Sequence, residues 1–236
     1  MGQDMDHQTA KGDTNDADQI IVSNASKVIK GHAVLSNVSV NLKRGGIYGF
    51  FGLNGSGKTM LFRAIAGLVR LDSGTIRVFG EAIGENSSFP KSLGIIIEAV
   101  GFWEEYTGFR NLKLLASIKH QIDDNEICAA LARVGLDPSD KRTYRKYSLG
   151  MKQRLGIAQA IMERPELLIL DEPTNALDTD GLLTVLEIIK EQQQRGATVL
   201  IASHNVADLE ELCERRFKMH EGSLSEEVPE IEKRLS

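Results

Sequence analysis

The hydrophobic positions of the chain form short apolar runs separated by stretches of helical periodicity. Four runs are brief, mostly apolar and free of regular polar alternation, which predicts buried strands. They are residues 47–51, 95–97, 167–170 and 198–202. Unbroken runs of this kind, with helices between them, indicate a parallel sheet covered on both faces. The predicted fold class is therefore α/β.

Further segments complete this pattern at both ends of the chain. Residues 19–28, 34–42 and 75–80 alternate or run apolar in the manner of strands. Helices are predicted at 60–68 and at 182–194, where a glycine two residues later is expected to end the second one.

A third helical region extends from about residue 107 to residue 164. In its first part we expect four side chains to share one face of a helix: Leu112, Leu115, Ala116 and Ile118. Three later positions continue the same apolar period: Ile127, Leu131 and Val134. Gly135 is expected to end that helix.

Composition and charge place the chain among globular proteins. It has 236 residues, of which 42% are hydrophobic, and its formal net charge of −5 is unevenly distributed. Residues 1–19 contain five Asp and one Lys, so we expect residues 1–18 to be a disordered acidic tail and residues 19–236 to be the folded domain. No secretory signal is recognisable, and no apolar run approaches the ~18 residues that span a bilayer, which predicts a soluble chain. Cys128 and Cys213 are far apart, as expected for reduced thiols in a cytosol.

The strongest chemical signal is a glycine-rich loop between the strand at 47–51 and the helix at 60–68. Its residues match the phosphate-loop pattern G-x-x-x-x-G-K-[ST] and are Gly52, Leu53, Asn54, Gly55, Ser56, Gly57, Lys58 and Thr59. Glycines allow backbone N–H groups to surround phosphate oxygens, and the helix N-terminus favours the anion. Lys58 can reach the β- and γ-phosphates and the Thr59 hydroxyl can bind Mg²⁺. The alternative, a glycine-rich turn without a ligand, does not account for the flanking strand and helix.

Two carboxylates follow the apolar run at 167–170. Ligands bind at the carboxyl ends of strands in open α/β sheets, which is where Asp171 and Glu172 are expected to lie. Asp171 is suited to hold Mg²⁺ and Glu172 to orient or deprotonate an attacking water. The alternative is a pair of solvated acids at a strand end, which the phosphate loop disfavours.

His204 stands in the same position after the run at 198–202. A lone histidine is usually structural or solvated, but at the tip of a core strand its Nε2 could contact a γ-phosphate. The other four histidines, at positions 7, 32, 120 and 220, have no such placement and are interpreted as ordinary.

The segment Tyr147–Arg154 (YSLGMKQR) lies between the phosphate loop and the acidic strand and opens a helix. Ser148 and the free N–H groups of that first turn form a possible anion site. With this segment the chain resembles the nucleotide-binding subunits of ATP-binding cassette (ABC) transporters. The order is that of the family: phosphate loop, signature segment, Asp-Glu strand, Asn175–Asp178 as the D-loop, and His204 as the switch histidine. The resemblance covers about residues 19–225.

The resemblance implies a fold, a set of site residues and a working assembly. The fold is a P-loop NTPase of the ABC type, with a RecA-like core, an antiparallel β subdomain and a helical subdomain at about residues 99–165. ATP and Mg²⁺ are the implied cofactors, with catalytic roles for Glu172, His204 and Lys58. Met60 and Asp178 join the phosphate loop among the nucleotide-binding positions, and Thr59, Asp171 and Glu98 are the implied metal ligands. Ser148 and Gly150 contact the γ-phosphate held by a second cassette, so that two cassettes enclose two ATP molecules.

Three departures from the family pattern stand out. The signature is usually Leu-Ser-Gly-Gly-Gln, whereas this chain has Tyr-Ser-Leu-Gly-Met, which keeps Ser148 and Gly150. The usual glutamine after the strand that ends at residue 97 is Glu98, which can bind Mg²⁺ but adds negative charge beside the triphosphate. The aromatic residue that usually stacks on adenine falls near Ile29, which has no π-face.

These variants are similar to cassettes that serve bacitracin and lantibiotic export or immunity. We therefore expect a cytoplasmic ATPase, peripheral on the membrane, that works with a permease in a separate chain and with a second cassette. Trp103 is the preferred permease contact among Phe102, Trp103 and Tyr106, although packing within the helical subdomain explains these aromatics equally well. A soluble ABC ATPase acting on nucleic acid or ribosomes is the alternative, and the folded part is not basic enough to favour it. A degenerate cassette that does not hydrolyse ATP is disfavoured, because the catalytic positions are all present.

Overall fold

A six-stranded sheet forms the centre of the protein. The computed structural model describes residues 18–84, 89–98, 101–204 and 211–227, so nearly all of the predicted acidic tail lies outside the described residues. The strand order is β10-β9-β3-β8-β7-β6. Their bounds are β3 Ile47–Phe51, β6 Leu93–Ile96, β7 Leu167–Asp171, β8 Thr198–Ser203, β9 Arg215–His220 and β10 Ser223–Glu227. All neighbours pair in parallel except β9 and β10, which are antiparallel. The predicted parallel sheet is confirmed.

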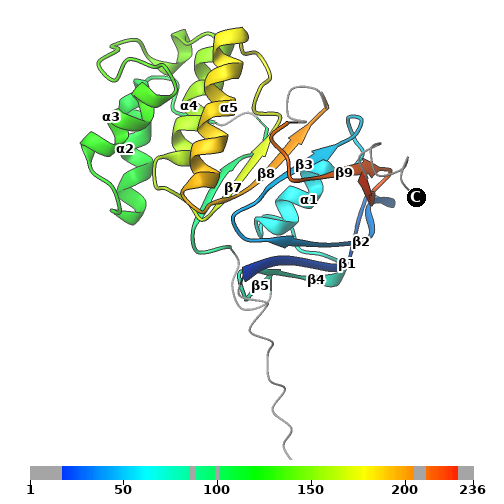
Figure 1. Cartoon of the computed structure of the whole chain (residues 1–236). Helices are drawn as coiled ribbons and strands as arrows, with labels where there is room; N and C mark the ends of the chain where they lie inside the picture. The colour runs from blue at the N-terminus through cyan, green and yellow to red at the C-terminus, as the bar shows by residue number, and fades with distance from the viewer. Residues whose placement is uncertain (1–17, 85–88, 99–100, 205–210, 228–236) are drawn as a thin grey trace, which may run out of the picture.

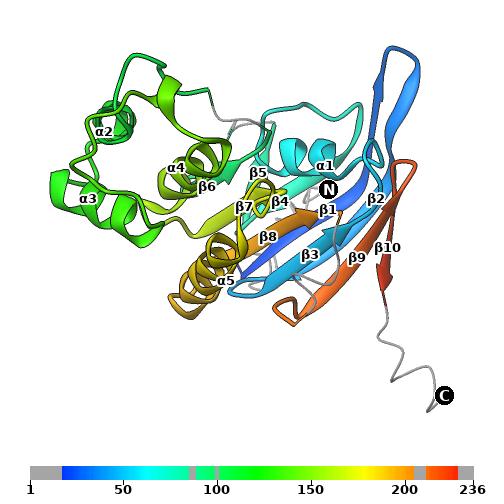
Figure 2. The same ribbon diagram turned by 90° about the horizontal axis from the view of Figure 1, so that it is seen from above.

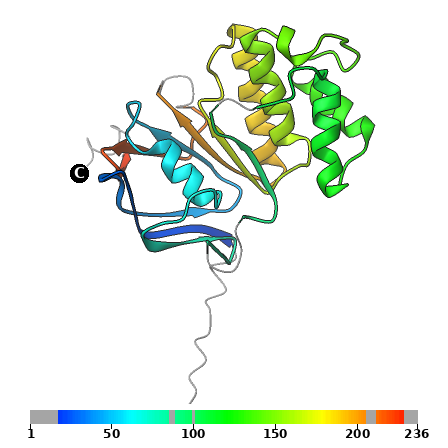
Figure 3. The ribbon, with the colours of Figure 1, turned by 180° about the vertical axis from the view of Figure 1, so that it is seen from behind.

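A second sheet of four antiparallel strands has the order β2-β1-β4-β5. Its strands are β1 Gln19–Ile29, β2 His32–Lys43, β4 Ser73–Val78 and β5 Glu81–Ile83. The helix α1, Lys58–Ile65, lies between this sheet and the six-stranded one (Figure 1, and from behind in Figure 3). The side chains of Leu61, Phe62 and Ile65 are fully buried there.

Alternating side chains of the core strands enter two different hydrophobic clusters. Leu167 and Ile169 pack on the side of α1, whereas Leu168 and Leu170 pack on the opposite side with the other helices. Successive side chains of a strand point to opposite faces, so a strand that is apolar throughout needs cover on both. This is why β7 contains no polar residue before Asp171.

The helices α2 to α5 gather on the face opposite α1, and α2 and α3 extend to one end of the molecule (Figure 2). Their bounds are α2 Gly108–Lys119, α3 Asp124–Arg133, α4 Leu149–Ile161 and α5 Thr179–Gln194. The helical region predicted at 107–164 is thus confirmed as α2, α3 and α4. The exact subdomain boundary of 99–165 stays a prediction.

The expectation for Ile118 was wrong. Leu112 and Ala116 are buried in the helical cluster, whereas Ile118 is 75% exposed. Each residue of an α-helix advances about 100°, so Ile118 is turned roughly 200° away from Ala116. Apolar character alone placed it on the wrong face.

The pattern also did not predict β5, β9 and β10. In β9 only Phe217 and Met219 are buried, while the residues between and before them are charged. A strand with one face toward solvent needs few apolar residues, so it lacks the apolar run from which buried strands are predicted. β9 and β10 extend the six-stranded sheet beside β3, the strand that leads into the phosphate loop, whereas β5 is the edge strand of the four-stranded sheet.

A substitution at Gly94 in β6 tests the packing of α4 on the central sheet. A Cβ at this position would lie 1.9 Å from the carbonyl oxygen of Ala160 in α4, so one element must move. We expect Gly94→Ala to lower the free energy of unfolding by about 1–3 kcal/mol, measured by urea denaturation. Gly101→Ala is the matched control, because a Cβ there meets no atom within 4 Å. Equal stability of the two variants would contradict this account.

Candidate functional site

The loop from Gly52 to Thr59 connects β3 to α1 and is held close to two other segments. A Cβ on Gly52 would lie 2.3 Å from the carbonyl oxygen of Met219, and one on Gly57 would lie 2.7 Å from that of Val34. Gly57 also has φ +112°, a left-handed conformation that disfavours side chains. Glycine is thus required at both positions by the neighbouring backbone as well as by the loop itself.

The Lys58 side chain folds back on the loop. It is only 5% exposed, and its Nζ donates to the carbonyl oxygens of Gly52 at 2.7 Å and Leu53 at 3.2 Å. A buried ammonium group needs such partners, since desolvation without them is costly. The ammonium group therefore already lies beside the loop, and only a small movement is needed for it to contact an anion bound there.

A cavity of about 420 Å³ adjoins this loop and collects most of the predicted site residues. Its lining comes from four parts of the chain: Val34, residues 54–60 with Arg63, Glu98, and the pair Asp171–Glu172. The predicted positions Asn54 to Met60 are all included. Three carboxylates and two basic side chains therefore surround one space.

Asp171 is the most constrained carboxylate of the cavity. The Thr59 hydroxyl donates to its Oδ2 at 2.5 Å, while its Oδ1 is buried and has no hydrogen-bond partner among the described residues. Burial raises the pKa of Asp171, an effect that Thr59 and Lys58 oppose and that the charges of Glu172 and Glu98 strengthen. An unpartnered carboxylate oxygen beside a hydroxyl fits a hard divalent cation.

The described residues contain no group of three or more His, Cys, Asp or Glu side chains arranged to hold a metal ion. Mg²⁺ does not require such a group, because it commonly binds one or two carboxylates together with substrate phosphates and water. Thr59 and Asp171 thus fit Mg²⁺ better than a cation that needs an all-protein cage.

Glu172 follows β7 and contacts His204, which follows β8. Its Oε2 lies 2.8 Å from His204 Nδ1, and its Oε1 is buried without a hydrogen-bond partner among the described residues. An ionised carboxylate only accepts, so Nδ1 must carry the proton in this pair. His204 Nε2 can then donate to a phosphate only when the ring is an imidazolium. The structure brings these two residues into contact, and the sequence alone does not predict this contact.

Glu98 lines the same cavity, but its carboxylate forms an ion pair with Arg63 of α1 at 2.9 Å. Both side chains are partly exposed, so the pair is weak in energy. It nevertheless offsets the negative charge that Glu98 brings in place of the usual glutamine. The sequence motifs do not identify Arg63 as a site residue. Its position one turn after Thr59 on α1 puts both side chains on the same face of the helix, which could have indicated it.

Ser148, Gly150 and Asp178 are not among the residues that line this cavity. Ser148 caps α4 by accepting from the N–H of Met151 at 3.2 Å. Asp178 caps α5 through the N–H of Gly181 and pairs with Arg154 at 2.9 Å, contacts that lower the pKa of its carboxyl group. Within one chain these residues are therefore separate from the loop.

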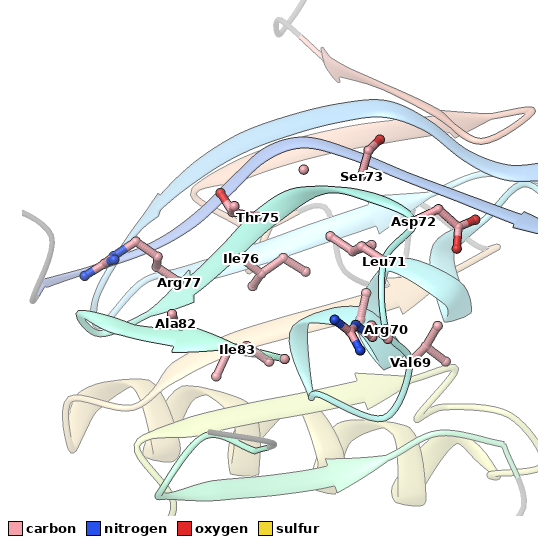
Figure 4. Close-up of a pocket in the computed structure, with 13 residues that line it drawn as sticks. Val69, Arg70, Leu71, Asp72, Ser73, Thr75, Ile76, Arg77, Ala82 and Ile83 are labelled. Atoms are coloured by element: carbon pink, nitrogen blue, oxygen red, sulfur yellow. The ribbon is translucent and has the colours of Figure 1, made fainter. Parts of the chain in front are cut away.

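The described residues line other cavities as well. One of about 550 Å³ lies on another side of the phosphate loop, where His204 and His220 both line it. The sequence pattern gives His220 no such place, because it does not predict β9. Another of about 360 Å³ lies between the end of α1 and the strands β4 and β5 (Figure 4). Arg70 lines it from the segment after α1 and Ile83 from β5, and none of the predicted site residues is included.

Comparison with known proteins places this geometry in a family. The family model described as ABC transporter matches residues 35–175, more than half of the chain. The chain is 47% identical over 205 residues to the uncharacterized ABC transporter ATP-binding protein YybJ of Bacillus subtilis (strain 168), covering 87% of this chain and 94% of that protein. It is 40% identical to the bacitracin transport ATP-binding protein BcrA of Bacillus licheniformis, covering 89% and 69%. It is 34% identical to the lantibiotic transport ATP-binding protein SrtF of Streptococcus pyogenes, covering 86% and 87%.

Solved structures agree with these relatives. An ATP-binding subunit of an ABC transporter superimposes with a TM-score of 0.81 at 26% identity, covering 92% of each chain. A bacterial ABC transporter cassette solved as a dimer gives a TM-score of 0.80 at 21% identity, covering 88% of this chain and 97% of that one, and shows likeness of fold alone.

The two sheets and the glycine loop define a P-loop ATPase with a RecA-like core, an antiparallel β subdomain and a helical subdomain. The chain belongs to the family of ABC transporter ATP-binding subunits. The predicted resemblance, fold class and ATPase activity are thereby confirmed. Within the described ranges, no helix combines the length and apolarity needed to cross a bilayer.

Lys58→Ala tests the loop's contribution to nucleotide binding. A hydrogen bond from a charged group contributes about 1.5–3 kcal/mol, so we expect the Kd for ATP to rise about 10- to 100-fold. Isothermal titration calorimetry measures the change. Lys190→Ala, an exposed position on α5, is the matched control and should bind ATP like the parent protein. Unchanged affinity in Lys58→Ala would contradict the assignment.

Proposed function

We propose that this protein hydrolyses ATP to drive export of a peptide antibiotic or a similar amphipathic compound through a separate membrane permease. The observation that carries the proposal is the similarity over most of the chain to proteins named for bacitracin and lantibiotic transport. The same similarity favours transport over an action on nucleic acid or ribosomes. The protein would then act at the cytoplasmic face of the membrane, held there by its permease.

The phosphate loop and Lys58 bind the triphosphate of ATP. Thr59 and Asp171 would hold Mg²⁺, with Glu98 lining the same cavity, and a bound ion would supply positive charge beside the phosphates. The hydrogen bond between Thr59 and Asp171 keeps both oxygen ligands in place before the ion arrives. Loop N–H groups, with the positive end of α1 behind them, stabilise the charge that develops on the γ-phosphoryl group.

Glu172 acts as the general base for the attacking water. Its Oε1 has no hydrogen-bond partner among the described residues and can take the proton, while Oε2 lies 2.8 Å from His204 Nδ1. His204 keeps the carboxylate oriented through Nδ1. The Nε2 atom of the same ring, when protonated, is available to donate to the γ-phosphate. The two groups therefore work as a pair built from the ends of neighbouring strands.

A second cassette completes the site. Ser148 and Gly150 do not line the cavity of their own chain. The phosphate loop and the signature segment each have one large apolar side chain that is exposed to solvent. They are Leu53 in the phosphate loop, 80% exposed, and Leu149 in the signature segment, 73% exposed. Burial of both against a partner cassette would bring Ser148 and Gly150 to the other chain's nucleotide, with Asp178 nearby in the D-loop. The partner is either a second copy or a related cassette.

Trp103 is the side chain proposed to contact the permease. Phe102 is buried and packs edge-on against Tyr144, whereas Trp103 is 53% exposed and stacks on Tyr106. Exposed tryptophan is typical of sites where a few residues contribute most of the binding energy. Packing within the chain therefore explains Phe102, whereas the exposed part of Trp103 supports its proposed contact with the permease.

Glu172→Gln tests the general-base role. The amide cannot accept the proton, so we expect kcat for ATP hydrolysis to fall about 100- to 10,000-fold. ATP should still bind, and size-exclusion chromatography should show a dimer with ATP but not with ADP. A variant that hydrolyses ATP normally would show that the assignment is wrong.

The same variant tests the transport role in cells. Cells that produce the protein with its permease should tolerate more bacitracin or lantibiotic than cells that produce the permease with Glu172→Gln. Equal tolerance of both strains to these compounds would contradict the proposed substrate class without affecting the ATPase assignment.

Glu98→Gln tests whether the extra carboxylate makes the site depend more strictly on Mg²⁺. Removing the charge should strengthen ATP binding in EDTA several-fold, because a screened carboxylate near phosphate costs about 1 kcal/mol. The Mg²⁺ titration of hydrolysis should become shallower as well. Glu104→Gln, an exposed position outside the cavity, is the control. An unchanged Mg²⁺ titration in Glu98→Gln would refute the hypothesis.

A further inference from the structure

The side chain of Gln153 joins α4 to the segment that follows β7. Its Nε2 donates to the carbonyl oxygen of Pro173 at 3.0 Å and lies 3.4 Å from that of Glu172. The contact is partly buried and its acceptors are backbone atoms. Gln153 therefore holds the backbone at Glu172 and Pro173, and this contact does not depend on the conformation of the Glu172 side chain.

The backbone of Glu172 needs this support. Its φ of +51° is an uncommon conformation for a residue other than glycine, which persists only where the surroundings hold it. On one side, its N–H donates to the carbonyl oxygen of Ala202 in β8 at 2.9 Å. On the other, its carbonyl oxygen accepts from the N–H of Asn175 at 3.3 Å, and Gln153 secures the next carbonyl.

The neighbouring residue on α4 fastens the other end of the same segment. Arg154 pairs with Asp178 at 2.9 Å, and Asp178 caps α5 through the N–H of Gly181. Residues 172–178 are thus attached to α4 at both ends, through two consecutive side chains of one helix. The proposed signature segment begins that helix, since Ser148 is its cap.

We propose that Gln153 is a positioning residue for Glu172, and that α4 makes the signature segment and the catalytic carboxylate one structural unit. The proposal rests on the role of Glu172 stated above. Movement of α4 when Ser148 meets the partner's nucleotide would reach Glu172 at the chain's own nucleotide. Gln153 touches no reacting atom and acts only by holding the Glu172–Pro173 peptide.

Gln153→Met removes the amide and keeps the length of the side chain. We expect kcat for ATP hydrolysis by the full chain to fall about 10- to 100-fold, because small displacements of a catalytic group are costly. The KM and the Kd for ATP should stay within twofold of the parent values. Gln159→Met makes the same change on the same helix at a side chain with no hydrogen bond recorded among the described residues, and should alter kcat less than twofold. Gln153→Glu provides a second variant, since it removes the donor and keeps the shape.

A double variant separates positioning from a general structural effect. In Glu172→Gln, the further change Gln153→Met should cause no additional loss of the residual hydrolysis, because its effect passes through Glu172. An equal fold-loss in both backgrounds, unchanged kcat in Gln153→Met, or a joint loss of ATP affinity would overturn the proposal. Normal hydrolysis by Glu172→Gln alone would instead show that the general-base role has failed, and the positioning role with it.

Discussion

The hydrogen bond between Thr59 and Asp171 is the contact on which the site depends. It joins the first turn of α1 to the tip of β7, 112 residues later in the sequence. The bond forms because β3, β8 and β7 are parallel neighbours in register, with Phe51 beside Ser203 and Asp171 beside Ala202. Their carboxyl ends therefore meet at one edge of the sheet, where ligands bind in folds of this class.

Charge balance is the second constraint on that edge. The cavity collects the carboxylates of Glu98, Asp171 and Glu172, while Lys58 and Arg63 supply the positive charge. Lys58 is buried and bonded to carbonyl oxygens of its own loop, so the main cation is already desolvated and oriented. Arg63 compensates the one carboxylate that departs from the family pattern. A site arranged in this way loses little free energy to reorganisation when charge develops on a phosphate.

The helix α4 connects the parts of the molecule that would face different nucleotides. Leu149 in its first turn is 73% exposed and belongs to the proposed signature segment, whereas Gln153 and Arg154 contact the segment that follows β7. Gly94 allows β6 to approach the same helix closely, which leaves α4 little freedom to shift independently of the sheet. Packing density of this kind favours movement as a unit over gradual deformation.

The sequence alone determined the layered α/β architecture, because unbroken apolar strands can be stable only in a sheet covered on both faces. It also determined the phosphate loop and the acidic strand tip, since their residue types follow from phosphate and metal chemistry. It could not determine the partners of Glu172, Glu98 and Asp178, which lie in segments distant along the chain. Nor did it predict the exposure of Ile118, or β9, whose few apolar residues cover one face only. Those features depend on strand register and helix packing, and only the tertiary structure decides which distant side chains meet.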